Sequence, residues 1–307
     1  MTTQNSLQQL AQYTTIVADT GDLHAISRLK PTDATTNPSL ILAAFASGEH
    51  DELMASVKGM DIDDAIDHLT VALGQKISQI IAGRVSTEVD ARLSFDTDAT
   101  VQKALKFIKL YENLGVDKSK VLIKIAATWE GIQAAKILEQ QGIACNLTLL
   151  FTTAQARACA DANVTLISPF VGRITDFQKA QTGLESIAIH DDMGVNSVKE
   201  IYQFYKKHGY RTEVMGASFR NIHQLIALAG CDLLTISPAL LDELASVNLS
   251  VTQNLTTTDD ILPKPKPLTE AQFRSIQDNE PLNALLIKGI EGFVKAHQDL
   301  KDRLAAS

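Results

Sequence analysis

The sequence predicts an α/β fold, a (β/α)₈ or TIM barrel with extra N- and C-terminal helices. Eight short runs of apolar and β-branched residues recur along the chain, and amphipathic stretches of helical period separate them. That alternation is typical of parallel strands joined by helical crossovers, and eight strands are the number that closes a barrel. The length of 307 residues suits one barrel, which usually takes about 250 residues plus insertions.

The predicted strands are short and are separated by helical patterns. They cover Ile16–Thr20, Ala34–Asn37, Val85–Asp90, Val121–Thr128, Ala144–Phe151, Thr165–Val171, Glu213–Phe219 and Leu233–Pro238. The clearest helical periodicity lies in Val101–Leu114, Ile132–Gln141 and Ala154–Ala162. A doubly wound open sheet is the alternative fold. It favours a glycine-rich turn after the first strand, and Ala18–Asp22 has the sequence Ala-Asp-Thr-Gly-Asp.

Further segments are predicted outside the eight strand–helix units. They are a helix near Leu7–Gln12, insertions at Ser47–Asp64 and Gln178–Asn196, an extended connection at Thr256–Pro267 and a last helix from about Pro281 to Leu304. Thr269 and Gln272 have the spacing of a capping box, which predicts the start of another helix. No linker divides the chain, so residues 1–307 are expected to form a single domain.

Composition and charge exclude several classes of protein. Apolar residues make up 45% and charged residues 21%, as in ordinary globular proteins. A net charge of −8 argues against a general binder of nucleic acid or anionic membranes. The first ten residues do not resemble a signal peptide, no apolar stretch approaches a membrane span, and the three cysteines lack the spacing of a disulfide framework or zinc site. We therefore expect a cytoplasmic protein without a metal.

A lysine lies in the middle of the fourth predicted strand. Side chains alternate along a strand, so Lys124 shares a face with Leu122 and Ala126. The opposite face is entirely branched and apolar, which suits packing against helices. Lys124 is therefore predicted to point into the barrel.

The same alternation, with polar residues assigned to the barrel interior, predicts inward sets for four other strands. The sets are Ser86, Glu88 and Asp90; Asn146 and Thr148; Ser168 and Phe170; and Gly216, Ser218 and Arg220, while Asp19 and Asn37 lie late in the first and second strands. They concentrate towards the strand C-termini, where barrel active sites lie. Burying such charges costs on the order of several kcal/mol unless they satisfy one another, so the constellation indicates function rather than structure.

The chemistry that fits these residues is covalent catalysis by an amine. A dry pocket disfavours the charged form of a lysine, and the neutral amine can form a Schiff base with a carbonyl. The resulting iminium accepts electrons when a neighbouring carbon–carbon bond breaks. Such a reaction needs one group to take a hydroxyl proton and another to help expel water, and Asp19 and Glu88 suit these two roles.

Six segments resemble the motifs of the transaldolase family. They are Asp33–Leu40 (DATTNPSL), Ser86–Ser94 (STEVDARLS), Leu122–Gly131 (LIKIAATWEG), Cys145–Phe151 (CNLTLLF), Ser168–Arg173 (SPFVGR) and Met215–Asn221 (MGASFRN). The motifs occur in order, and the resemblance runs from about Tyr13 to the last helix. The chain resembles the long form of this family, which belongs to the aldolases that use a Schiff base.

The resemblance implies a (β/α)₈ barrel, commonly a homodimer, that acts on phosphorylated ketose and aldose sugars without a cofactor. The implied reaction transfers a dihydroxyacetone unit from sedoheptulose 7-phosphate to glyceraldehyde 3-phosphate in the non-oxidative pentose phosphate pathway. Lys124 matches the Schiff-base lysine. Asp19 matches the carboxylate that moves the proton of the cleaved hydroxyl. Glu88, with Thr148 and a water molecule, matches the acid/base group.

The resemblance also implies a binding pocket. Asn37, Asn146 and Ser168 match residues that hold sugar hydroxyls, and Phe170 shares the sixth-strand motif. Arg173, Arg220 and Ser218 match a phosphate site. Two alternatives remain: a fructose-6-phosphate aldolase-type lyase and a non-catalytic phosphosugar-binding barrel.

Overall fold

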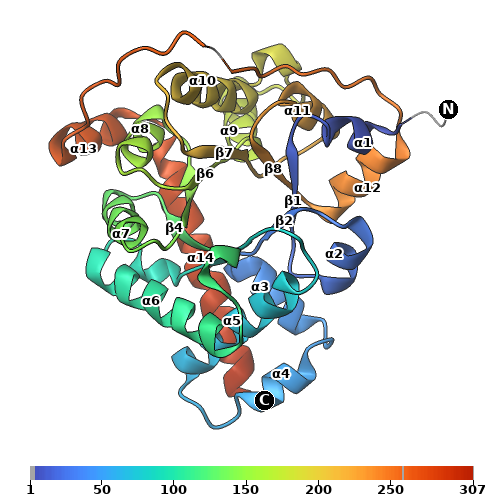
Figure 1. Cartoon of the computed structure of the whole chain (residues 1–307), viewed down its shortest axis with the longest axis vertical. Coiled ribbons are helices and arrows are strands. Elements are labelled where there is room, and N and C mark those ends of the chain that lie inside the picture. The colour runs from blue at the N-terminus through green and yellow to red at the C-terminus, as the bar shows by residue number, and fades with distance from the viewer. Residues whose placement is uncertain (1–3, 258, 307) are drawn as a thin grey trace.

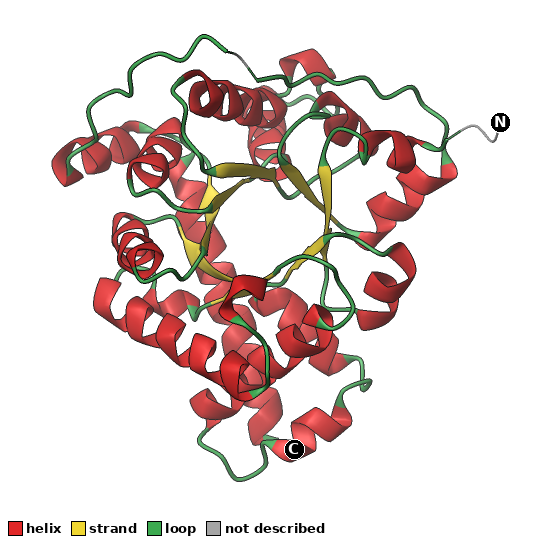
Figure 2. Ribbon diagram, viewed as in Figure 1, coloured by secondary structure: helices red, strands yellow, loops and turns green. Residues whose placement is uncertain are grey.

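Eight parallel strands form a closed barrel in the computed structural model, which describes residues 4–257 and 259–306. The strand order follows the sequence, and the first strand pairs with the last. Helices surround the ring of strands (Figure 2). The strands are β1 (Thr15–Asp19), β2 (Asp33–Thr35), β3 (Val85–Glu88), β4 (Val121–Ala126), β5 (Cys145–Leu150), β6 (Leu166–Pro169), β7 (Glu213–Gly216) and β8 (Leu233–Ile236). The predicted barrel and each of its eight strands are confirmed.

Helices connect consecutive strands and extend the fold at both ends (Figure 1). The α-helices are α1 (Ser6–Leu10), α2 (Leu23–Leu29), α3 (Pro38–Ala46), α4 (Asp51–Ser56), α5 (Ile62–Ser78), α6 (Thr97–Asn113), α7 (Trp129–Gln140), α8 (Thr153–Asp161), α9 (Gly172–Thr182), α10 (Met193–Lys207), α11 (Ile222–Ala227), α12 (Pro238–Ser246), α13 (Glu270–Asn279) and α14 (Asn283–Ala305). Short 3₁₀ turns are η1 (Ala91–Leu93), η2 (Lys118–Lys120) and η3 (Ile189–Asp191).

Most predicted additions are confirmed. Thr269 caps α13 through a capping box, because its side chain accepts from Gln272 N while the Gln272 side chain accepts from Thr269 N. The connection before α13 is irregular and largely exposed where it is described. The two predicted insertions are largely helical: residues 47–64 include α4 and the start of α5, and residues 178–196 include the end of α9, η3 and the start of α10.

The N-terminal half of the barrel interior is apolar. Val17, Leu122, Leu166, Met215 and Leu233 form one buried cluster there. Four of them lie two residues before a polar side chain that faces the cavity described below. Because every second residue of a strand points inward, the interior holds two layers of side chains. The layer nearer the strand N-termini is apolar and closes the barrel, and the layer nearer the strand C-termini is mostly polar.

The predicted inward face of β7 is wrong. In β7, Met215 lies in the interior cluster and Ala217 lines the cavity, so Gly216 faces outward towards Leu228 and Leu234. Ser218 still reaches the cavity because its backbone has a φ of 61°, outside the extended region, and the alternation ends there.

In β5, the alternation fails at Leu149. This residue has a φ of 58°, and the β5–β6 register shifts between Leu147 and Leu150. Leu149 therefore packs beside Phe170 and Phe293 at the upper end of the barrel and not against the outer helices with Leu147. A bulge of this kind redirects a side chain, and no residue type at this position indicates the bulge from the sequence.

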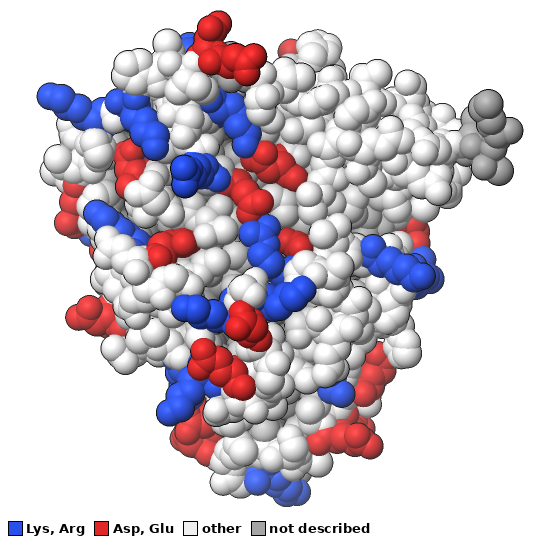
Figure 3. Space-filling model, viewed as in Figure 1, with Lys and Arg blue, Asp and Glu red and all other residues white. Residues whose placement is uncertain are grey.

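The face of the molecule in Figure 3 carries interspersed acidic and basic side chains and shows no large patch of one sign. Among the described residues, no helix is both long and apolar enough to cross a membrane.

Candidate active site

A cavity of about 240 Å³ opens at the C-terminal end of the barrel. It is lined by Asp19, Thr35, Asn37, Lys124, Thr148, Ser168, Phe170, Arg173, Ala217, Ser218, Phe219, Arg220, Thr235, Ser237 and Phe293. Nine of the sequence-predicted site residues are in this lining. The other two, Glu88 and Asn146, lie directly behind it and contact lining residues. The structure thus brings all the predicted residues together.

Lys124 and Glu88 form a buried ion pair. The register of β3 and β4 places the two residues side by side, and Lys124 Nζ lies 3.0 Å from Glu88 Oε2. Lys124 Nζ also donates to the Thr36 carbonyl oxygen at 3.0 Å. Their exposed fractions are only 4% and 6%. A lysine amine therefore faces the cavity with a carboxylate in position to exchange a proton with it.

Burial raises the pKa of Glu88 above its usual value, although the Lys124 ammonium acts in the opposite direction. A carboxyl group with a raised pKa gives and takes protons more readily near neutral pH than an ordinary glutamate does. The raised pKa of Glu88 therefore suits this carboxylate to accept a proton from Lys124 and to return it.

Asp19, the last residue of β1, lies on another part of the wall and keeps one side open to the cavity. Enclosure by the protein raises its pKa, opposed by Lys124, by a hydrogen bond from Thr35 and by Arg173. Thr35 Oγ1 donates to Asp19 Oδ1 at 3.0 Å and lies 2.7 Å from Thr235 Oγ1. Because the Thr35 proton goes to Asp19, Thr235 must donate to Thr35, which fixes the orientation of the carboxylate.

Thr35, Thr235 and Phe293 are cavity residues that the sequence did not identify. Threonine is an ordinary strand residue, so neither threonine stands out by type. Their register beside β1 was the available signal, since Thr35 pairs with Asp19 and Thr235 with Val17. Phe293 comes from α14, which packs on α3, α5 and η1, and no motif linked this helix to the cavity.

Asn146 joins three strands below the cavity. Its side-chain amide donates to Ser86 Oγ at 3.0 Å and accepts from Ser168 Oγ at 2.7 Å. Thr148, two residues further along β5, is fully buried, and its hydroxyl has no hydrogen-bond partner within the described chain. A buried hydroxyl without a partner is costly, so this group suits a bound water molecule or substrate atom.

Asn37 ends the polar segment after β2. Its side-chain oxygen accepts from Leu40 N at 3.0 Å and thereby caps α3. The cap uses only the side-chain oxygen, and Asn37 also lines the cavity. Asn37 can therefore bind a sugar oxygen without losing its structural role.

Two arginines lie at the rim. Arg173, in the first turn of α9, stacks its guanidinium over the rings of Phe170 and Phe293, with centroid distances of 4.9 and 6.0 Å. Burial and the nearby Arg220 both lower the pKa of Arg173, and no carboxylate among the described residues lies within ion-pair distance of it. Arg220 pairs with Asp176 at 2.7 Å. An unpaired, partly buried guanidinium beside a second one favours an anion.

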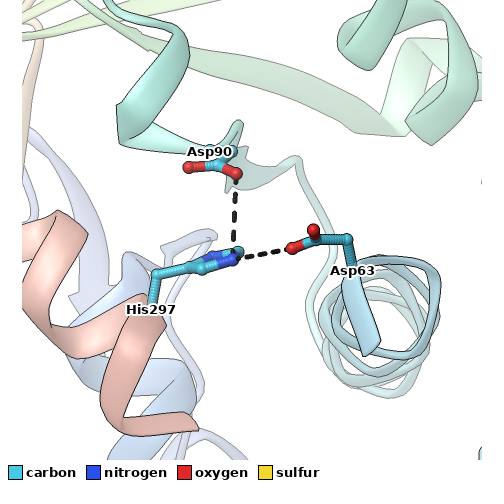
Figure 4. Close-up of side chains that lie close together, drawn as sticks. All are labelled: Asp63, Asp90 and His297. Atoms are coloured by element: carbon cyan, nitrogen blue, oxygen red, sulfur yellow. Dashed lines mark hydrogen bonds and ion pairs between the residues drawn. The ribbon is translucent and has the colours of Figure 1, made fainter. Parts of the chain in front are cut away.

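A separate cluster contains Asp63, Asp90 and His297, whose side-chain ligand atoms lie within 4.8 Å of one another (Figure 4). A cation of the protein already occupies the space between them. Arg92 Nη2 lies 2.8 Å from Asp63 Oδ1, 2.5 Å from Asp90 Oδ2 and 3.1 Å from His297 Nε2. The donor set therefore does not suit a metal ion while Arg92 is in place. Asp90, predicted to share the inward face of Glu88, instead lies beside α14.

Comparisons with known proteins agree with this geometry. The family model described as transaldolase/fructose-6-phosphate aldolase matches residues 16–304. A transaldolase of Shewanella sp. strain MR-4 is 54% identical over 316 residues, which cover 98% of this chain and 99% of the relative. Transaldolases of Shewanella oneidensis and Shewanella pealeana are 54% and 52% identical, with the same coverage. The chain is a member of the transaldolase/fructose-6-phosphate aldolase family.

Proposed function

We propose that this enzyme is a transferase of the transaldolase type. It moves a dihydroxyacetone unit from sedoheptulose 7-phosphate to glyceraldehyde 3-phosphate and gives erythrose 4-phosphate and fructose 6-phosphate. The observation that carries the proposal is the buried Lys124–Glu88 pair at the cavity wall, with Asp19 as a second carboxylate beside the same cavity. The relatives named transaldolase support the choice of reaction.

Schiff-base formation begins with proton transfer from the Lys124 ammonium to Glu88. The neutral amine attacks C2 of the ketose and forms a carbinolamine. Glu88 then returns its proton to the departing hydroxyl through a water molecule held by the Thr148 hydroxyl, and water leaves. The 3.0 Å separation between Lys124 Nζ and Glu88 Oε2 and the unpartnered Thr148 hydroxyl support these roles.

Carbon–carbon cleavage is assigned to Asp19. Its carboxylate removes the proton from the C4 hydroxyl, the C3–C4 bond breaks, and the electron pair moves into the iminium to form an enamine. Erythrose 4-phosphate then leaves. Hydrogen bonding from Thr35 holds the carboxylate in one orientation, which favours proton removal from a fixed direction.

Transfer reverses these steps with a new aldehyde. The enamine carbon attacks C1 of glyceraldehyde 3-phosphate, Asp19 returns the proton to the new hydroxyl, and hydrolysis releases fructose 6-phosphate. Asn37, Asn146 and Ser168 are proposed to hold sugar hydroxyls. The apolar edges of Phe170 and Phe293 limit access of water to the enamine, which keeps it available for the acceptor.

The phosphate is assigned to the rim. Arg173 and Arg220, with the Ser218 hydroxyl, line the same side of the cavity. A guanidinium can contact two phosphate oxygens at once, which explains how an acidic protein attracts an anionic substrate locally.

The aldolase-type lyase and the non-catalytic barrel predict different products. The test is to incubate the enzyme with fructose 6-phosphate, with and without erythrose 4-phosphate. A transferase forms sedoheptulose 7-phosphate with the acceptor and releases almost no free dihydroxyacetone without it. Steady release of dihydroxyacetone without acceptor would indicate a lyase, and no turnover in either case would indicate a binding protein.

We also propose that the enzyme acts in the cytoplasm as a homodimer. The three cysteines are free and buried, which suits a reducing compartment. Sedimentation equilibrium tests the assembly: a mass near twice 33.3 kDa supports the dimer, and a mass near 33.3 kDa contradicts it.

A further inference from the structure

We propose that Asp176 is a positioning residue for phosphate recognition: it holds one edge of the Arg220 guanidinium and presents the other edge to the substrate. The inference rests on the proposed function, because Asp176 would orient an arginine that binds the phosphate group of the proposed sugar substrates. Asp176 belongs to the second turn of α9 and does not line the cavity itself.

The contact between the two side chains is edge-on. Arg220 Nε lies 3.0 Å from Asp176 Oδ2, and Arg220 Nη2 lies 2.7 Å from the same oxygen. Arg220 Nη1 takes no part and lies 3.4 Å from the Ser218 hydroxyl, on the cavity side. Since the carboxylate occupies the Nε edge, only the edge that includes Nη1 remains for a second anion.

The stem of Arg220 is also confined. A Cβ atom built on Gly172 would lie 2.9 Å from Arg220 Cγ and 2.8 Å from Arg220 Nη1, so the arginine lies directly against this glycine. Its backbone N–H donates to Gln224 Oε1 at 2.8 Å. Gln224 in turn donates to Asp192 Oδ2 and to Thr175 Oγ1, the residue before Asp176. The first turns of α9 therefore supply both the slot and the carboxylate that hold Arg220.

The charges at the rim fit a phosphate monoester. Arg173 and Lys288 line a groove that shares Arg220 with the cavity, and neither forms an ion pair among the described residues. Asp176 neutralises one of the three cations. Two positive charges remain, which matches a dianionic phosphate. Asp176 thus orients one arginine and keeps the excess of positive charge in proportion to the ligand.

A double-mutant cycle tests the inference. Asp176→Ala should raise KM for erythrose 4-phosphate about fivefold, the scale of a half-exposed ion pair, with kcat nearly unchanged. Asp176→Asn should have a smaller effect, because its side-chain oxygen still accepts a hydrogen bond. In the Arg220→Ala background, Asp176→Ala should have no further effect on KM, because the residue acts through Arg220.

The matched control is Asp242→Ala. Asp242 pairs with Arg28 at a similarly exposed site outside the cavity, so its loss should leave KM for erythrose 4-phosphate unchanged. Three results would overturn the inference: a fall in KM for Asp176→Ala, which would make Asp176 a competitor of the phosphate; an equal rise in KM for erythrose and erythrose 4-phosphate; or additive effects in the cycle. A failure of the proposed function would instead appear in the wild-type enzyme as absence of transfer.

Discussion

Glu88 and Asp90 are two residues apart, yet the pKa of Glu88 is raised and the pKa of Asp90 is lowered. Glu88 forms an ion pair with Lys124, and burial raises the pKa of Glu88. Burial also acts to raise the pKa of Asp90, but hydrogen bonds from Arg92, together with the electrostatic effect of the nearby His297, hold that pKa below its usual value. The comparison shows that the number of hydrogen bonds to a carboxylate separates an anchoring role from a reactive one. Asp90 accepts hydrogen bonds from three nitrogen atoms of Arg92 and is held in its charged form, whereas Glu88 has a single ion pair among the described residues, with Lys124, and can exchange a proton.

The largest effect should come from Glu88→Gln. The amide cannot accept the Lys124 proton, so we expect kcat to fall by about 10²–10⁴-fold. Asp90→Asn is the matched variant: it should lower the free energy of unfolding by about 1–3 kcal/mol, since it breaks a charged hydrogen-bonded contact, and kcat should fall much less. Steady-state kinetics and urea unfolding measure both. Similar losses of kcat in the two variants would remove the distinction between them.

An intermediate effect is expected for Arg220→Ala. Loss of a charge-assisted contact to phosphate should cost at least about 1.5–3 kcal/mol, or roughly ten- to a hundredfold in kcat/KM with erythrose 4-phosphate. The loss with erythrose should be much smaller. Equal losses on the two acceptors would mean that Arg220 supports the pocket in general and does not recognise the phosphate.

The smallest effect is the pH dependence of stability that arises from the cluster of Asp63, Asp90 and His297. Burial lowers the pKa of His297, although Asp90 and Asp63 act against this, so the folded state favours neutral histidine. Stability should therefore fall as pH drops below about 6.5, because the unfolded chain binds the proton more readily. His297→Gln should flatten the pH dependence of the unfolding free energy between about pH 7 and pH 5, by less than about 1 kcal/mol. An unchanged slope would contradict this account of His297.

A second acid transition should follow from Asp63. Burial acts to raise the pKa of Asp63, but hydrogen bonds from Lys301, Arg92 and His297 keep this pKa well below its usual range. A depressed carboxyl pKa stabilises the fold above about pH 4, and this contribution is lost as pH falls further. Asp63→Asn should remove that part of the acid sensitivity in urea unfolding at pH 3–5. Full retention of the slope in the variant would exclude the cluster as its source.

Much of the site could be predicted because buried polar residues are costly and therefore conspicuous. Lys124 stands between apolar residues on a strand, and alternation alone turned it inward correctly. The assignment by polarity failed in β7. It placed Gly216 on the inward face, whereas the structure places Met215 there. Ser218 reached the cavity only through its left-handed backbone. These backbone departures depend on tertiary packing, which a local pattern does not contain.

Other parts of the site had no local signal at all. Thr35 and Thr235 matter because neighbouring strands bring them to Asp19, and Phe293 matters because the last helix crosses to the barrel rim. Asp176 has the appearance of an ordinary exposed helix carboxylate until Arg220 is seen beside it. Such pairings arise between segments far apart in the chain, so only the fold reveals them.

The division of labour between Lys124, Glu88 and Asp19 has one direct test: borohydride reduction in the presence of fructose 6-phosphate, followed by peptide mapping. Wild-type enzyme should carry a three-carbon, dihydroxyacetone-derived adduct on the peptide that contains Lys124. Asp19→Ala should carry the intact ketose phosphate on the same lysine, because the Schiff base forms and cleavage fails, and Glu88→Gln should form either adduct slowly. An adduct on Lys288, or no adduct on any peptide of the wild-type enzyme, would contradict the account.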